Sequence, residues 1–230
     1  MGIGKNLQFL RQLRNGMTQE DLAERMGVSR QTVSRWETDQ AYPEMDKLLE
    51  LCELFSCTLD QLVREDMTVV DEEHYSGVRV ETVEGFRYMR YAVVSTEPED
   101  DAKEHVAGWA KLLGVEDPQI IGWDFPVLSQ EQINVYNMHG YAAALILPEG
   151  VEPGERAEVR SQPAQRYAVI TIRRPFDAPF RIIPGAYQIL LRYLQANGCT
   201  EPKKGTCIPC FEREYEIDGE MRMDVYMAIE

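Results

Sequence analysis

The stretch from Thr18 to Thr38, TQEDLAERMGVSRQTVSRWET, contains the signals for two short helices joined by a tight turn. Thr18 is placed to cap the first helix, and Asp21 stands three residues later, which completes a capping box. Ser29 is placed in the same way before the second helix. Between them, Gly27 suits a turn that needs a positive φ, which glycine adopts without steric cost. The stretch therefore predicts two helices that cross closely.

The second of these helices has one apolar and one polar face. Val33 and Trp36 are three residues apart, so they share the face that turns towards the core. The other positions carry side chains of the kinds that hydrogen bond to base edges and phosphates. With Gln19 and Ser29 to position the DNA backbone, the candidate DNA-binding residues are Gln19, Ser29, Arg30, Gln31, Thr32, Ser34 and Arg35. An ordinary helical hairpin would have no need to expose these side chains together.

This stretch resembles the helix-turn-helix of the Cro/C1-type, or XRE, family of transcriptional regulators. The matching residues are Gln19, Ala23, Gly27, Val33 and Glu37. The resemblance implies an all-α domain of five helices that binds operator DNA. It also implies an ion pair between Arg11 and Glu37, with Arg11 one residue further from Gln19 than the family spacing.

Three further helices complete the expected first domain, residues 1–66. Leucines at 7, 10 and 13 predict a helix from about Ile3 to Asn15. A second apolar stripe predicts a helix over 45–55, and the capping box of Thr58 and Gln61 predicts a short one over 59–64. The acidic segment 67–77 lacks helical periodicity and is interpreted as a linker, in which His74 is the only histidine.

From residue 78 onwards the pattern changes to strands, beginning with VRVETV over 78–83, and to longer helices. The order strand, helix, strand, strand occurs twice, first over 86–95, 102–113, 120–125 and 141–147, and again over 166–173, 183–197, 211–217 and 221–229. Asp218-Gly219 predicts a hairpin turn between the last two strands. Two such units can form one curved sheet with both helices on one face. A groove along the axis between the two repeats would then be a plausible ligand cleft.

This second part, 78–230, resembles the GyrI-like, or AraC-type, effector-binding domain. The resemblance rests on RYAVITI, IPGAYQILLRYLQANG, PCFEREYEIDG and MDVYMAIE, with IIGWDF and HGYAAALILPEG in the first repeat. It implies a pocket glutamate that meets cationic, aromatic or lipophilic ligands, and Glu212 is the position that fits. Glu214 and Glu216 share the same strand face as Glu212, so they stay open as alternatives.

Aromatic side chains near the expected cleft could attract a cation through their ring faces, or they could simply belong to the core. The candidate effector-binding residues are Glu212, Tyr215, Trp109, Trp123, Tyr141 and Tyr187. A second feature, Cys207 and Cys210 in a CxxC, could be half of a zinc site with Cys199 nearby, a redox pair, or two ordinary thiols. We expect the ordinary thiols, and no metal or cofactor.

Charge and length add limits of their own. A chain of 230 residues favours two domains, and its formal net charge is −15. Residues 1–36 nevertheless carry six Lys and Arg against three Asp and Glu, so positive charge gathers around the expected reading helix. Modest, salt-sensitive DNA affinity is expected. Scattered cysteines, five in number, and the lack of an apolar leader or membrane-length run favour a cytoplasmic location.

Together these patterns predict a ligand-responsive bacterial transcriptional regulator that acts as a homodimer and is not an enzyme. Two alternatives remain open. Some domains that resemble the second half look like hydrolases of reactive small molecules, which use a pocket glutamate with aromatic neighbours. Alternatively, the acidic second domain could sequester a protein partner by mimicking DNA.

Overall fold

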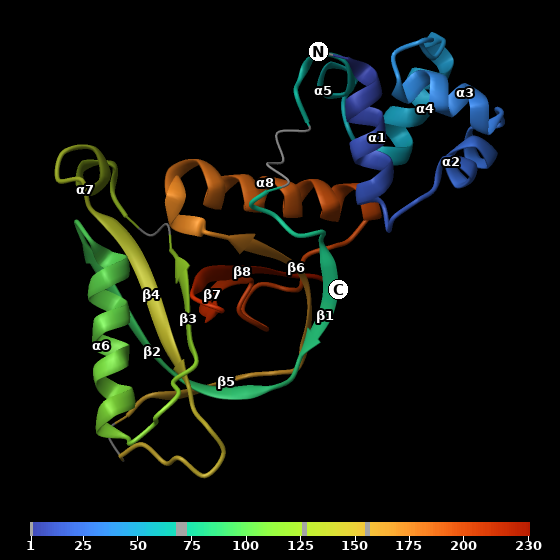
Figure 1. Ribbon diagram of the computed structural model, residues 1–230. Helices are drawn as coiled ribbons and strands as arrows, with labels where there is room; N and C mark the ends of the chain where they lie inside the picture. The colour runs from blue at the N-terminus through green and yellow to red at the C-terminus, as the bar shows by residue number, and fades with distance from the viewer. Residues whose placement is uncertain (1, 68–72, 126–127, 155–156) are drawn as a thin grey trace. The chain divides into compact units, whose positions relative to one another are not determined.

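The computed structural model describes residues 2–67, 73–125, 128–154 and 157–230 (Figure 1). Its contacts divide the chain into two compact units, the first made of Met1–Val78 with Pro175–Thr200 and Glu230, and the second of Arg79–Arg174 with Glu201–Ile229. The expected domain limits of 1–66, 67–77 and 78–230 remain a prediction. Part of the expected linker, residues 68–72, lies outside the described residues.

The first unit begins with five helices, labelled α1 to α5 in Figure 1. They are α1 (Ile3–Leu13), α2 (Gln19–Met26), α3 (Arg30–Glu37), α4 (Met45–Phe55) and α5 (Leu59–Arg64). Both predicted capping boxes are present, since the hydroxyl of Thr18 accepts from the backbone N–H of Asp21, and that of Thr58 from Gln61. Gly27 closes α2 at φ 63°, as the turn requires. The predicted helix-turn-helix is therefore confirmed.

The five helices share one apolar core. Leu7 and Leu22 are fully buried in it, and Trp36 is 4% exposed. α1 crosses α3 closely at Gly4, where an added Cβ would come within 2.5 Å of the Glu37 carbonyl oxygen. Buried Asn6 links α1 to α5 and to the residues that follow it. Its side-chain NH₂ donates to the Leu62 carbonyl at 2.9 Å, and its side-chain oxygen accepts from the Met67 N–H at 3.0 Å.

A long helix, α8 (Pro179–Asn197), completes the first unit, after a 3₁₀ turn at Pro175–Asp177. It begins four residues before the predicted start at Ile183, because Pro179 occupies a first-turn position where the missing N–H costs nothing. Near its C-terminal end, the Asn197 side chain donates to the Leu13 carbonyl at 3.2 Å.

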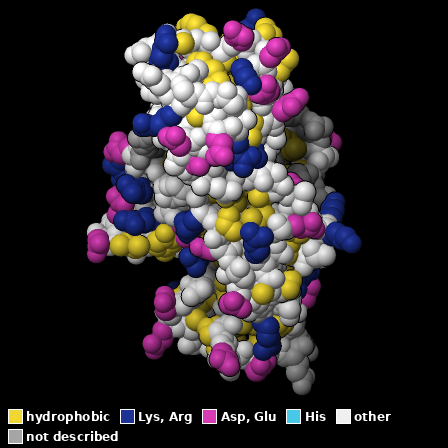
Figure 2. Space-filling model, turned by 90° about the vertical axis from the view of Figure 1, so that its right-hand side faces the viewer, with side chains coloured by type: hydrophobic (Ala, Val, Ile, Leu, Met, Phe, Trp, Pro, Cys, Tyr) yellow, Lys and Arg dark blue, Asp and Glu magenta, His cyan; other side chains and the backbone are white. Residues whose placement is uncertain are grey.

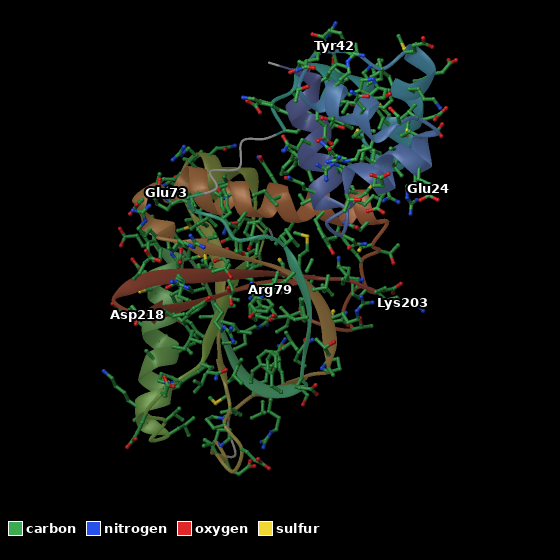
Figure 3. All side chains as sticks on the ribbon, turned by 45° about the vertical axis from the view of Figure 1, so that its right-hand side comes forward. Glu24, Tyr42, Glu73, Arg79, Lys203 and Asp218 are labelled. Atoms are coloured by element: carbon green, nitrogen blue, oxygen red, sulfur yellow. The ribbon has the colours of Figure 1, made fainter. Side chains whose placement is uncertain are left out.

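The second unit is built on an eight-stranded antiparallel sheet in the order β1-β6-β8-β7-β3-β4-β2-β5. The strands are β1 (Arg79–Val83), β2 (Phe86–Ser95), β3 (Ile120–Asp124), β4 (His139–Ile146), β5 (Val159–Gln162), β6 (Gln165–Arg173), β7 (Cys210–Ile217) and β8 (Glu220–Ala228). The sheet curls strongly in Figure 1, and Gly85, in the turn between β1 and β2, lies close to the Gln162 carbonyl at the end of β5. Figure 3 shows Asp218 at the tip of the β7–β8 hairpin, where the sequence predicts the turn.

The duplicated unit is present as predicted. The first copy is β2, α6 (Pro98–Leu112), β3 and β4, and the second is β6, α8, β7 and β8. The copies meet where β3 pairs with β7, with Gly122 opposite Glu212. The predicted fold class is thus confirmed. Two short elements were not predicted: β5, which has four residues, and α7 (Gln130–Asn134), which is little more than one turn long. Segments this short carry little periodic signal.

Candidate functional sites

The outer face of α3 carries most of the candidate DNA-binding side chains. Arg30, Gln31 and Arg35 are exposed, whereas Thr32 and Ser34 are half-buried. Val33 and Trp36 point into the core, at 0% and 4% exposure, so the division into two faces is as the spacing predicts.

The start of α3 is held by a compact hydrogen-bonded cap. The Ser29 hydroxyl accepts from the Thr32 backbone N–H at 3.1 Å and lies 2.9 Å from the Thr32 hydroxyl. An N-cap of this kind satisfies one of the donors that the first turn leaves without an intrahelical partner. Ser29 and Thr32 therefore set the position at which α3 begins.

Beneath α3 lies a buried network centred on Glu37. Arg11 donates to both of its carboxylate oxygens, from Nε at 2.6 Å and from Nη2 at 3.1 Å. The amide of Gln19 also donates to Glu37, at 2.8 Å, and Arg11 reaches the Met17 carbonyl. The implied ion pair between Arg11 and Glu37 is confirmed, and the one-residue difference in spacing does not prevent it. Gln19, a candidate for contacting the DNA backbone, is thereby oriented by the core.

Charge around this helix is mixed. On the face drawn in Figure 2, basic and acidic side chains lie interspersed. An exposed ion pair between Arg30 and Glu20, with 3.9 Å between Nε and the carboxylate oxygen, offsets part of the positive charge at the start of α3. Both side chains are more than half exposed, so this pair is free to rearrange when a phosphate approaches.

The second unit contains a pocket of about 390 Å³ between α6 and the strands β3, β4 and β7. It lies at the junction of the two repeats, where a groove was predicted. The lining residues are Lys103, Glu104, Ala107, Pro118, Ile120, Ile121, Gly122, Tyr141, Glu212 and Glu214. They include three carboxylates and one ammonium group, so the pocket has an excess of negative charge.

Tyr141 forms one wall of this pocket with an unusual hydroxyl. The residue is 3% exposed, and within the described part of the chain its hydroxyl has no hydrogen-bond partner. Burial and the nearby carboxylate of Glu212 raise the pKa of the phenol, so it stays protonated. Gly122 makes room for it, since a Cβ there would overlap the Tyr141 hydroxyl.

Lys103 places an ammonium group at the same wall. Its Nζ contacts Glu99 at 2.5 Å and also the carboxylate of Glu214, and it lies 5.8 Å from the centre of the Tyr141 ring. Burial lowers the pKa of Lys103, but the two carboxylates raise it by more, so the net shift is upwards. Lys103 is therefore charged at neutral pH.

The structure narrows the choice among the three glutamates of β7. Glu212 and Glu214 both line the pocket, whereas Glu216 lies further along the strand and is exposed. Of the six candidate effector-binding residues, Glu212 and Tyr141 are brought together.

The other four candidates lie elsewhere. Trp109 packs edge-on against Tyr91 and His105, with ring centres 6.0 and 5.0 Å apart. Trp123 packs on the opposite face of the sheet, against a cluster that contains Tyr88, Tyr167, Phe211 and Tyr226. Tyr187 belongs to α8 in the first unit.

Tyr215 takes part in a polar cluster on the opposite face of β7. Its hydroxyl donates at 3.1 Å to Asp224, which is 1% exposed. The guanidinium groups of Arg79 and Arg213 form ion pairs with the same carboxylate, each at 3.2 Å. Arg79, which is labelled in Figure 3, reaches Asp224 from the edge strand β1. Sequence reasoning missed this cluster and also Lys103, because residues from β1, β7, β8 and α6 meet only through strand pairing and helix packing.

The described cysteines are all free thiols. Cys207 and Cys210 are half-buried, and burial raises the pKa of Cys210. Across the described ranges, no three or more His, Cys, Asp or Glu side chains gather in a way that could hold a metal ion, and this includes the region of His74. In the same ranges, no helix is both long and apolar enough to cross a membrane.

The five helices and the capped, outward-facing α3 define a helix-turn-helix domain. Residues 7–62 match the family model described as Helix-turn-helix, in agreement with a helix-turn-helix domain at the N-terminal end of the chain.

Two curated proteins share sequence with this region. The HTH-type transcriptional activator BcrR of Enterococcus faecalis is 40% identical over 81 residues, which is 34% of this chain and 39% of BcrR. The HTH-type transcriptional regulator ImmR of Bacillus subtilis (strain 168) is 35% identical over 66 residues, or 29% of this chain and 51% of ImmR. The chain therefore matches only about half of the length of ImmR, and less than half of the length of BcrR.

Solved structures also align with the chain, at low similarity. The EcmrR C-terminal domain has a TM-score of 0.46 and 11% identity, covering 68% of this chain and 98% of its own. EcmrR in a complex with DNA has a TM-score of 0.45 and 12% identity, and the alignment covers 93% of this chain and 85% of EcmrR. SAV2435 bound to tetraphenylphosphonium has a TM-score of 0.40 and 13% identity, and the alignment covers 67% of this chain and 94% of SAV2435.

Proposed function

We propose that this protein is a ligand-responsive transcriptional regulator, in which α3 reads operator DNA and the pocket beside Tyr141 binds a cationic small molecule. The observation that supports DNA reading is the exposed row of Arg30, Gln31 and Arg35 on a helix that is capped at its start and held from below by the Arg11–Glu37 pair. A rigid helix with donors on its outer face suits the major groove.

A gel shift with the promoter of the protein's own gene tests the DNA-binding part. Gln31→Ala and Arg35→Ala should each weaken specific binding by about 1–3 kcal/mol, because each removes a base contact. Gln12→Ala and Arg25→Ala are matched controls, since they remove the same groups from exposed positions on α1 and α2. If Gln31→Ala and Arg35→Ala bind as tightly as these controls, α3 is not the reading helix.

Homodimer formation belongs to the same proposal. Helices of this kind meet two half-sites about one turn of DNA apart, and two copies of the protein supply the two helices. Light scattering of the free protein and of its operator complex should give a dimer mass. A monomer mass in both samples contradicts this part of the proposal.

The pocket's excess of negative charge supports a cationic effector. A carboxylate half-buried against aromatic and apolar groups gains from an opposite charge, and the ring face of Tyr141 adds cation–π attraction of about 0.5–2 kcal/mol. Glu212→Gln keeps the shape of the side chain and removes its charge, so it should weaken binding of tetraphenylphosphonium or rhodamine 6G at least tenfold, as measured by fluorescence titration.

Glu216→Gln is the matched control, since it makes the same change on the same strand outside the pocket. Equal affinity in the two variants excludes Glu212 as the binding group. Incubation with electrophilic esters separates the sensor from a hydrolase, because turnover would require catalysis, whereas a sensor binds without consuming its ligand.

A further inference from the structure

The pocket of the second unit already holds a cation, the ammonium group of Lys103. Only 25% of the Lys103 side chain and 24% of the Glu214 side chain are exposed, so their contact is largely shielded from water. The ring of Tyr141, at 5.8 Å, and the carboxylate of Glu214 together surround this ammonium. A carboxylate and an aromatic face are also the groups that a cationic ligand uses.

Lys103 has a second partner that allows it to leave this position. Glu99 lies one turn earlier on α6, 2.5 Å from Nζ, and 44% of its side chain is exposed. The long stem of lysine is flexible, so the ammonium can turn away from Glu214 and keep its contact with Glu99 at the surface. Departure from the pocket therefore does not leave the Lys103 charge unpaired.

Tyr141, one of the residues that line the pocket, also carries a polar atom that Lys103 does not satisfy. The buried Tyr141 hydroxyl has no hydrogen-bond partner in the described part of the chain, and a buried hydroxyl without one is costly. The hydroxyl oxygen is closed to solvent, so the Tyr141 ring has to shift before the N–H group of a ligand can donate to it. A quaternary cation has no N–H group and cannot do so.

We infer that Lys103 is a built-in competitor of the effector, and that the effector is an organic ammonium ion with N–H groups that takes its place between Glu214 and Tyr141. This inference rests on the proposed binding of a cation in the pocket. It adds the ligand's chemical class and the residue that sets the pocket's affinity.

Isothermal titration of the full-length protein with benzylammonium tests the competition. Lys103→Met keeps most of the stem and removes the charge, so it should bind benzylammonium at least tenfold more tightly than the wild type. Lys103→Arg keeps a competing cation and should stay within threefold of the wild type. Adding Glu214→Gln to Lys103→Met should reverse the gain, because the carboxylate that attracts both cations is then absent.

A second titration tests the N–H requirement. Benzyltrimethylammonium, which has the same charge and ring, should bind more weakly than benzylammonium to both the wild type and Lys103→Met. In Tyr141→Phe the difference between the two ligands should shrink, since the accepting oxygen is gone. Equal affinity of the two ligands for the wild type overturns the amine assignment.

The outcomes separate this inference from the proposed function. If the wild type binds benzylammonium and Lys103→Met binds it no more tightly, Lys103 is not a competitor, although the pocket still takes cations. If neither protein binds benzylammonium, benzyltrimethylammonium or tetraphenylphosphonium, the cationic pocket itself is wrong and the inference falls with it. Circular dichroism of each variant confirms that it is folded.

Discussion

Two shielded ion pairs, one in each unit, differ in how completely they are enclosed. Arg11 and Glu37 have 10% and 3% of their side chains exposed, and Gln19 and the Met17 carbonyl complete the set of partners. Lys103 and Glu214 are about one-quarter exposed and border a pocket, next to a hydroxyl without a partner in the described part of the chain.

The difference shows how the same chemistry serves two purposes. Guanidinium is a planar fork that matches a carboxylate at two points, so the Arg11–Glu37 pair fixes one helix against another. Ammonium is a compact charge on a flexible stem, and on this ground we infer that another cation can replace Lys103. We therefore expect the first pair to control stability and the second to control ligand binding.

The largest expected effect comes from opening the enclosed pair. Arg11→Met leaves the buried Glu37 carboxylate without its main partner, so it should lower the free energy of unfolding by about 3–5 kcal/mol. Urea unfolding followed by Trp36 fluorescence, in a Trp109→Phe/Trp123→Phe background, measures this effect. The double variant Arg11→Met/Glu37→Met should recover much of the loss, because no charge then remains buried. A loss below about 1 kcal/mol would contradict the structural role of this pair.

A smaller effect is expected where α1 crosses α3. Gly4→Ala would place a Cβ 2.5 Å from the Glu37 carbonyl oxygen, and backbone atoms cannot move aside cheaply. Overpacking of this kind should cost about 1–3 kcal/mol in the same unfolding experiment. Gln8→Ala, at an exposed position of the same helix, is the control and should leave stability nearly unchanged. Equal stability of the two variants would show that the crossing is looser than the structure indicates.

Gly122 makes a similarly close approach in the pocket, and its substitution should affect ligand binding more than stability. Gly122→Ala adds a Cβ that overlaps the Tyr141 hydroxyl, so the ring must shift and cation affinity should fall about tenfold, or 1.4 kcal/mol. Fluorescence titration with rhodamine 6G measures this change. Unchanged affinity in Gly122→Ala would place the ligand away from β3.

The smallest expected effect is on stability at the open pair. Lys103→Met should change the free energy of unfolding by less than about 1 kcal/mol, because the Glu214 carboxylate borders the open pocket and water can solvate it once the ammonium group is absent. Urea unfolding followed by the fluorescence of Trp109 and Trp123, in a Trp36→Phe background, reports on the second unit. A loss comparable to that of Arg11→Met would mean that both pairs are structural, and the comparison would no longer hold.

Local sequence was sufficient to predict the helix-turn-helix. Its caps, its glycine turn and the apolar face of α3 are set by residues within four positions of one another, and the structure places each as predicted. The duplicated strand–helix–strand–strand order was predictable for the same reason, since helix and strand periodicities differ. These features determine which face of α3 is outward, and so which side chains can meet DNA.

The pocket was decided by tertiary structure. Sequence alternation put Glu212, Glu214 and Glu216 on one face of β7 but could not say which of them meet a helix. The pairing of β3 with β7 and the packing of α6 select Glu212 and Glu214, and bring Tyr141 and Lys103 to them from 71 and 109 residues away along the chain. The physical reason is range. Caps and periodicity act between neighbours in sequence, whereas a binding site depends on which distant surfaces the chain buries together.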